Sequence, residues 1–193
     1  GEEARDFGLV AITSAGENLV LTSGIMAGPK EVYARGGPGA KMGSLRLKAV
    51  LIERRSADLT PSRPHKGTNR DIAKKLLSTS VVKNALKKRG TPFLYKPSRL
   101  LGAMGTKNNQ ETTWTDKLDA ENIDPYRPGM DGCFACPVNC RPLNDLTACD
   151  HVPQDRYSKG DGPEYVTLGK FGPNVGISDV PQVLRLNNIC NDL

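Results

Sequence analysis

Three of the five cysteines stand within eight residues, and their spacing is the clearest chemical signal of the chain. Cys133, Cys136 and Cys140 follow a C-x2-C-x3-C pattern, so a curled backbone can turn their sulfurs toward one centre. Pro137 stiffens this segment, Gly132–Cys140, which we call the cysteine run. Thiolates gathered so tightly bind a soft metal ion or an iron–sulfur cluster, or else form disulfides.

Three readings of the cysteine run stay open from spacing alone. A tetrahedral zinc ion and a four-iron cluster each take four protein ligands, and the run offers three. Cys149 or His151, close downstream, could complete a zinc site. We favour an iron–sulfur cluster over zinc, and zinc over unliganded or disulfide-bonded cysteines. The radical-SAM pattern, C-x3-C-x2-C, runs in the reverse order and is set aside.

A glycine-rich segment around Arg35–Ser44 is the second candidate site. It has four glycines in eight residues, so its backbone can approach a ligand with the amides pointing inward, and Arg35 and Lys41 add positive charge. This chemistry suits a phosphate or pyrophosphate. The alternative is a flexible surface turn, which composition alone favours.

Glu164 is the third candidate, because a carboxylate here interrupts an otherwise apolar stretch, Gly162–Leu168. A carboxylate held among apolar side chains is a candidate for proton transfer. The alternative is an acid on a surface loop, which the sequence alone favours.

The elements that must position these residues are short. Hydrophobic residues make up 37% of the 193 residues, and 20 glycines and 14 prolines indicate many turns. Apolar runs predict a strand–turn–strand pair at 9–12 and 19–21, and a further strand at 47–52. Helical spacing predicts helices at 71–89 and from an N-cap at Ser178 to Leu193, with a short helical turn at 98–104. We expect loop at 105–131, with Trp114 as its anchor, and irregular structure at 141–162. The predicted class is α+β.

Charge is distributed unevenly along the chain, whose net charge is +6. Residues 54–107 hold 14 lysines and arginines against two acids, a net +12. With Phe93 and Tyr95 as the aromatics of this block and no binding motif, we expect a solvated helix face or a surface for an anionic substrate or partner, and no nucleic acid. No apolar run is long enough for a membrane helix, and crowded cysteines indicate a reducing compartment, so we expect no membrane and a cytoplasmic protein.

Taken together, these segments resemble the tungsten-containing aldehyde ferredoxin oxidoreductase family. The matching blocks stand in the family's order: Ala15–Val20, Arg35–Ser44 with Leu47–Ala49, Gly132–Cys140, and Gly162–Tyr165 leading to Gly172–Asn174. The segment Cys190–Leu193 is similar to the approach to a pterin-binding motif, with Asn191 in the place of its acid. Lys41 and Leu45 depart from the usual pattern of the glycine segment.

The resemblance implies a domain organisation. Residues 1–60 would be the C-terminal part of a β-rich, pterin-binding N-terminal domain, and residues 61–193 the first part of a mostly helical domain that carries the cluster cysteines. Family members are about three times as long, so we expect an internal fragment that is inactive alone. The fourth cluster cysteine and further pterin contacts would lie beyond Leu193.

The resemblance also implies an activity, the oxidation of aldehydes to carboxylic acids. A tungsten (or molybdenum) bis-pterin and a 4Fe-4S cluster would carry the electrons to ferredoxin. Cys133, Cys136 and Cys140 would bind the cluster, and Glu164 would accept a proton. The pterin phosphates, with Mg2+, would lie at Arg35, Gly36, Gly37 and Gly39, and Asn191 would contribute a pterin contact.

A small aldehyde and ferredoxin are thus the expected partners, with a homodimer or an additional electron-transfer subunit compatible with the resemblance. Two alternatives remain. The chain could belong to a tungsten subunit that reduces an aromatic ring carried on coenzyme A (benzoyl-CoA type), for which the basic block would suit the anionic substrate. It could instead be a non-catalytic zinc-binding module.

Overall fold

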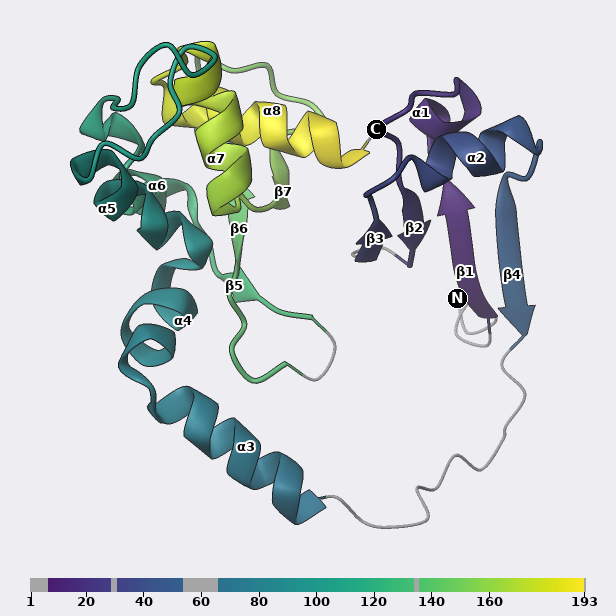
Figure 1. Cartoon of the computed structure of the whole chain (residues 1–193), viewed down its shortest axis with the longest axis horizontal. Helices are drawn as coiled ribbons and strands as arrows, with labels where there is room; N and C mark the ends of the chain where they lie inside the picture. Colours follow the sequence, from purple (N-terminus) through teal and green to yellow (C-terminus); the bar gives the residue numbers. More distant parts are fainter. Residues whose placement is uncertain (1–6, 29–30, 54–65, 134–135, 193) are drawn as a thin grey trace. The chain divides into compact units, whose positions relative to one another are not determined.

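The computed structural model describes residues 7–28, 31–53, 66–133 and 136–192 (Figure 1). The chain divides into two compact units, residues 1–64 with 192–193, and residues 65–191. The boundary expected near residue 60 lies outside the described residues. Both units combine helices with small sheets, which confirms the predicted α+β class. Within the described ranges, no helix has both the length and the apolar character needed to cross a membrane.

The first unit is built on a four-stranded antiparallel sheet in the order β3-β2-β1-β4. Val10 of β1 pairs with Ala27 on one side and Val50 on the other. The first predicted strand and the strand at 47–52 are confirmed. The four strands are β1 (Phe7–Ile12), β2 (Ile25–Ala27), β3 (Glu31–Tyr33) and β4 (Ala49–Glu53).

The predicted strand at 19–21 is wrong. A short helix, α1 (Ser14–Glu17), stands between the first two strands, and the chain leaves it through a turn. The Asn18 side chain donates to Ser14 O (2.9 Å) and the Val20 amide donates to Ala15 O (2.9 Å), which satisfies the carbonyls of the helix end. These bonds curl the apolar residues that follow, and Leu19 takes a positive φ of 58°.

The second unit begins with a long helical segment that carries most of the basic block. It comprises α3 (Lys66–Ser78), a π-helical turn (Val82–Leu86) and α4 (Lys87–Arg89). The predicted helix at 71–89 is confirmed as helical, with its stop at Gly90, but the structure begins it five residues earlier and divides it by a bend at Thr79. Gly90 ends the segment with φ 67° and ψ −164°, a conformation that glycine adopts without steric cost.

The part predicted as loop, 105–131, is partly helical. It contains α6 (Ala120–Ile123), flanked by 3-10 turns at Asp116–Leu118 and Asp124–Tyr126, and it follows α5 (Tyr95–Leu100). These helices and turns are three to six residues long, too short for a periodic apolar pattern to predict them. Trp114 packs against the hydrophobic core, as expected of the anchor.

The segment 141–162, predicted as irregular, contains two strands. The three-stranded antiparallel sheet β5-β6-β7 consists of β5 (Met130–Asp131), β6 (Arg141–Asp145) and β7 (Lys159–Asp161). Burial alternates along β6, but the two buried positions are Pro142 and Asn144 rather than apolar β-branched residues. The period of two is therefore present in the structure and absent from the hydrophobic pattern.

Two helices complete the unit, α7 (Tyr165–Phe171) and α8 (Val180–Asp192). The predicted C-terminal helix is confirmed, but its cap is Asp179 rather than Ser178, because the Asp179 carboxylate accepts from the Gln182 amide (3.0 Å). Leu168 of α7 and Leu184 of α8 are fully buried in the same hydrophobic core. That core also includes Tyr95, Leu118, Leu146 and Val183.

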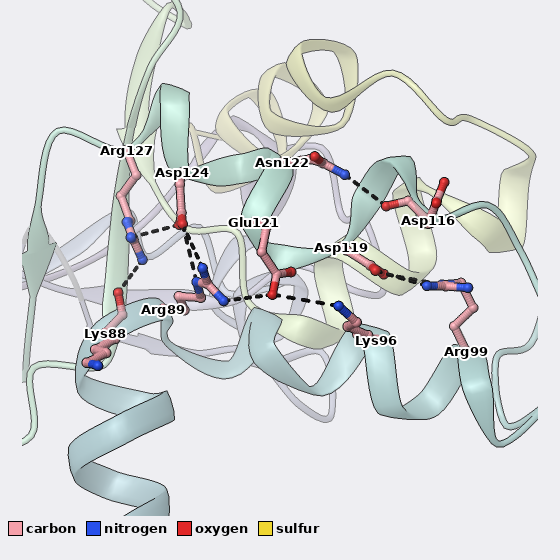
Figure 2. A network of polar contacts seen from close by, with 10 residues as sticks. All are labelled: Lys88, Arg89, Lys96, Arg99, Asp116, Asp119, Glu121, Asn122, Asp124 and Arg127. Carbon is pink, nitrogen blue, oxygen red and sulfur yellow. Dashed lines mark hydrogen bonds and ion pairs between the residues drawn. The ribbon is translucent and has the colours of Figure 1, made fainter.

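A network of ion pairs ties α4 and α5 to the segment around α6 (Figure 2). Arg89 contacts both Glu121 (2.8 Å) and Asp124 (3.1 Å), and Arg127 contacts the other Asp124 oxygen (2.8 Å). Arg99 binds Asp119 at 2.9 Å, with both side chains largely buried. The end of α4 is therefore held in place immediately before Gly90.

Candidate functional site

The cysteine run connects β5 to β6. Cys133 is exposed and Cys136 and Cys140 are half-buried, and all three are free thiols. The Cys136 amide donates to Cys133 O (3.0 Å), which keeps the backbones of the first two cysteines close to each other. The ends of the run meet, because a Cβ added at Gly132 would lie 2.3 Å from Asn139 Oδ1.

The three sulfurs are not drawn to one centre. Among the described side chains, no group of three His, Cys, Asp or Glu is close enough to hold a metal ion. The donor types nevertheless suit an iron–sulfur cluster, whose ligands are cysteine thiolates. The use of Cys133, Cys136 and Cys140 as common ligands therefore stays a prediction.

The surroundings of the Cys140 thiol include Glu164 and the other two cysteines of the run. Burial raises the pKa of the Cys140 thiol, and the nearby negative charges of Glu164, Cys136 and Cys133 raise it further. Packing points the same way, because Gly90 lies against Cys140 O and the next residue, Thr91, binds Glu164. That the carboxylate and the cysteine run act in one site stays a prediction.

Glu164 is half-buried and hydrogen-bonded, not an exposed loop acid. It stands at the N-cap position of α7, and its Oε2 accepts a short hydrogen bond from the Thr91 hydroxyl. The Thr91 oxygen in turn accepts from the Tyr165 amide (2.8 Å). Sequence reasoning missed Thr91, which no motif distinguishes from the other threonines.

Three buried or half-buried asparagines support the turn that carries Glu164. Asn144 and Asn188 exchange hydrogen bonds through their side chains (2.9 and 2.7 Å), and Asn144 also donates to Gly162 O (3.1 Å). Asn187 donates to Asp161 O (2.7 Å). This amide network joins β6 and α8 to the chain two residues before Glu164, and the adjacent asparagines at 187–188 were its one sequence signal.

Asn191, a predicted pterin contact, is exposed near the end of α8. Its side chain donates to Asp161 O (3.1 Å), the same carbonyl that Asn187 uses. The structure thus gives it a role in joining α8 to the end of β7. A contact to a pterin stays a prediction.

In the first unit, the segment Arg35–Ser44 was expected to turn its amides toward a ligand. Its second part does not do so, because residues 38–44 form a helix, α2 (Pro38–Ser44). Pro38 at the first helical turn favours this start, and Gly37 precedes it in a left-handed conformation (φ 69°). The Gly39 amide donates to Ser23 O (3.1 Å) and the Lys41 amide to Gly37 O (3.1 Å), so neither is available to a ligand.

Close packing explains most of the glycines. A Cβ on Gly39 would lie 2.3 Å from Gly24 O, and one on Gly43 would lie 2.0 Å from Gly16 O in α1. Gly36 is different, with φ 89° and open space around it. The Ser23 hydroxyl, next to Gly39, is buried and has no hydrogen-bond partner among the described residues. A phosphate site would therefore be limited to residues 35–37.

The two alternative zinc ligands lie elsewhere. Cys149 is buried in the hydrophobic core, where burial raises the pKa of its thiol. His151 is exposed, with its Nε2 3.4 Å from Asp179 Oδ2.

Two family models match the chain, one for each unit. Residues 1–54 match the aldehyde ferredoxin oxidoreductase N-terminal domain, and residues 67–193 match domains 2 and 3 of the same enzymes. Both matches place the chain in a class of oxidoreductases, whose domains have the α+β architecture described above. The chain belongs to the aldehyde ferredoxin oxidoreductase family, as its motifs predict.

Similar proteins include tungsten-containing aldehyde ferredoxin oxidoreductases of Pyrococcus furiosus and Thermococcus kodakarensis. Each is 28% identical to the chain, over 96% and 95% of it respectively. The chain spans 30% of the length of each. Among solved structures, the active-site complex BamBC of benzoyl coenzyme A reductase, with 1,5-dienoyl-CoA, has the same fold, with a TM-score of 0.63 and 22% identity over 99% of this chain and 30% of that one.

Proposed function

We propose that the protein containing this chain oxidises a small aldehyde to a carboxylic acid and passes the electrons to ferredoxin. The observation that carries the proposal is that Glu164 binds Thr91, whose neighbour Gly90 packs against Cys140 O at the end of the cysteine run. Family membership, and relatives named as tungsten-containing aldehyde ferredoxin oxidoreductases, support the redox assignment. Ferredoxin, or an additional electron-transfer subunit, would approach the protein near Cys133, the exposed cysteine.

The reaction consumes water and releases two electrons and two protons for each aldehyde. When bound, a tungsten or molybdenum bis-pterin would take the electron pair and a 4Fe-4S cluster would transfer the electrons singly. Cys133, Cys136 and Cys140 would supply three thiolates to that cluster. Glu164 would take one of the protons, since its carboxylate is fixed and half-buried next to the cysteine run.

The first unit would contribute the pterin-phosphate contacts. Arg35, Gly36 and Gly37 precede α2, where Gly36 has room for a ligand to approach its backbone. Arg35 and a bound Mg2+ would neutralise the phosphate charge. Gly39 would act by allowing close packing rather than by direct contact, because its amide is already bonded to Ser23 O.

Cysteine replacement in the full-length protein tests the cluster assignment. The protein is purified without oxygen, its iron, tungsten, molybdenum and zinc contents are measured, and an electron paramagnetic resonance spectrum is recorded after reduction. C133S, C136S and C140S should each lower the iron content and weaken the cluster signal. C190S, which removes an exposed cysteine outside the run, is the matched control. Zinc without iron or tungsten would support the zinc-module alternative.

Activity is measured with a viologen dye and a series of aldehydes. E164Q should abolish most of the aldehyde oxidation while the metal content stays at the wild-type value. A protein that contains the metals and oxidises no aldehyde would contradict the proposal.

A second candidate is reduction of an aromatic ring carried on coenzyme A. The observation in its favour is the basic surface of α3 and the following turns, where Lys74, Lys75, Lys83, Lys87 and Lys88 are exposed. None of these lysines has an ion-pair partner among the described residues. Such a surface would attract the phosphates of coenzyme A. Turnover of an aryl-CoA thioester, without aldehyde oxidation, would favour this candidate.

A further inference from the structure

The Thr91 hydroxyl has two partners, and together they fix its direction. The Tyr165 amide can only donate, so the Thr91 oxygen is the acceptor in that 2.8 Å bond. The single hydroxyl proton is then available for one acceptor, which is Glu164 Oε2. If the hydroxyl rotated away from the carboxylate, the hydrogen bonds of Thr91 to Glu164 and to the Tyr165 amide would both weaken.

Thr91 itself is held from two sides. Its neighbour Gly90 packs directly on the strand that follows the cysteine run, because an added Cβ would lie 2.3 Å from Cys140 O and 2.9 Å from Pro142 Cδ. Before Gly90, the Arg89 guanidinium is paired with two carboxylates, as Figure 2 shows. The hydroxyl is therefore attached to a fixed junction rather than to a mobile loop.

The two oxygens of Glu164 differ in consequence. Oε2 is occupied by Thr91, and Oε1 has no hydrogen-bond partner among the described residues. A carboxylate tied through one oxygen keeps the lone pairs of the other free in a constant direction. That is the geometry that a proton acceptor needs at a site where the donor atom is also fixed.

We propose that Thr91 is a positioning residue that holds the Glu164 carboxylate in one orientation and leaves Oε1 as the proton-accepting atom. The proposal rests on the function proposed for Glu164. It adds a residue that acts through Glu164 and touches neither substrate nor cofactor.

The test compares T91V, which keeps the shape and removes the hydroxyl, with T91S, which keeps the hydroxyl. T106V is the control, since Thr106 is a buried threonine of the second unit, and its hydroxyl donates to a backbone carbonyl, Met104 O (3.0 Å). All three are made in the full-length protein. The readout that needs no activity is hydrogen exchange of the Tyr165 amide, which loses its acceptor in T91V alone.

In T91V, the protection of the Tyr165 amide should fall about fivefold, the effect of losing one ordinary hydrogen bond. T91S should restore it, and T106V should leave it unchanged. Unchanged exchange in T91V would overturn the proposal, whether or not the protein oxidises aldehydes.

The kinetics of aldehyde oxidation test whether Thr91 positions Glu164. T91V should lower kcat about 10- to 100-fold with KM within about twofold of wild type, because misplacement of a reacting group affects the chemical step. In an E164Q background, T91V should cause no further loss, since its effect passes through Glu164. Independent, multiplicative losses would overturn the positioning role. A wild-type protein without aldehyde oxidation would refute the proposed function. Exchange would still decide whether the Thr91 hydroxyl binds the Tyr165 amide, the bond that fixes its direction.

Discussion

Replacement of Gly90 by alanine should destabilise the second unit strongly, because the new methyl meets both an unfavourable backbone conformation and a close backbone neighbour. Gly90 has φ 67° and ψ −164°, a combination that costs a residue with a side chain about 1–3 kcal/mol. The new methyl would also lie 2.3 Å from Cys140 O, a backbone atom that cannot rotate away. Overpacking of this kind costs about 1–3 kcal/mol, which gives about 2–6 kcal/mol in total.

Two control variants separate the two costs. Gly176 has φ 81° but nothing within 4 Å of an added Cβ, so G176A should cost only the conformational part, about 1–2 kcal/mol. Gly129 has neither a positive φ nor a close neighbour, so G129A should change the stability by less than about 0.5 kcal/mol.

The assay is urea unfolding followed by the fluorescence of Trp114, the one tryptophan, which packs against the core of this unit. The free energy of unfolding should be highest in G129A, lower in G176A and lowest in G90A. A G90A variant no less stable than G176A would show that the junction between Gly90 and Cys140 yields easily. The argument that this junction fixes Thr91 would then fail.

Three further predictions concern stability. The Asp145 carboxylate has a pKa of about 2, lowered by Lys159 and then by a threonine hydroxyl and amide, so its pairing contributes stability above about pH 4 that is lost as the pH falls toward 2. D145N should therefore lower the unfolding free energy at pH 7 by about 1 kcal/mol, since solvent screens the pair, and should match wild type near pH 2 in acid titrations of unfolding. L184A should cost about 2–5 kcal/mol in urea unfolding, whereas L100A, at a residue 69% exposed, should cost less than about 0.5. N188A leaves its buried amide partner unsatisfied and should cost about 1–3 kcal/mol by the same measurement; a neutral result would show that water replaces the side chain.

The sequence was informative where a hydrophobic period accompanies a clear stop signal. The long helical segment ending at Gly90, the strands β1 and β4, and α8 were all predicted for this reason. It was uninformative where buried positions hold polar residues or proline, as at Pro142 and Asn144 in β6. The strand prediction at 19–21 failed for another reason. Local hydrogen bonds to the end of α1 overrode the strand propensity of these apolar residues.

The candidate site was predicted in its residue types but not in its connections. Spacing identified the three cysteines, and an acid in an apolar stretch identified Glu164. That Thr91 binds Glu164, across 73 residues, depends on tertiary packing that no local pattern encodes. The glycine segment shows the opposite error, because glycines that serve helix contact in α1 and α2 look the same in sequence as glycines that serve a ligand.

The asparagine network behind Glu164 has a consequence for how the site responds to acidity. Asn144, Asn187 and Asn188 carry neutral amides, which neither gain nor lose protons across the range in which proteins are folded. The support of the turn is therefore the same in mildly acidic and mildly alkaline solution. A pH profile of the enzyme would report the reacting groups themselves, because the asparagines that hold the turn in place do not titrate.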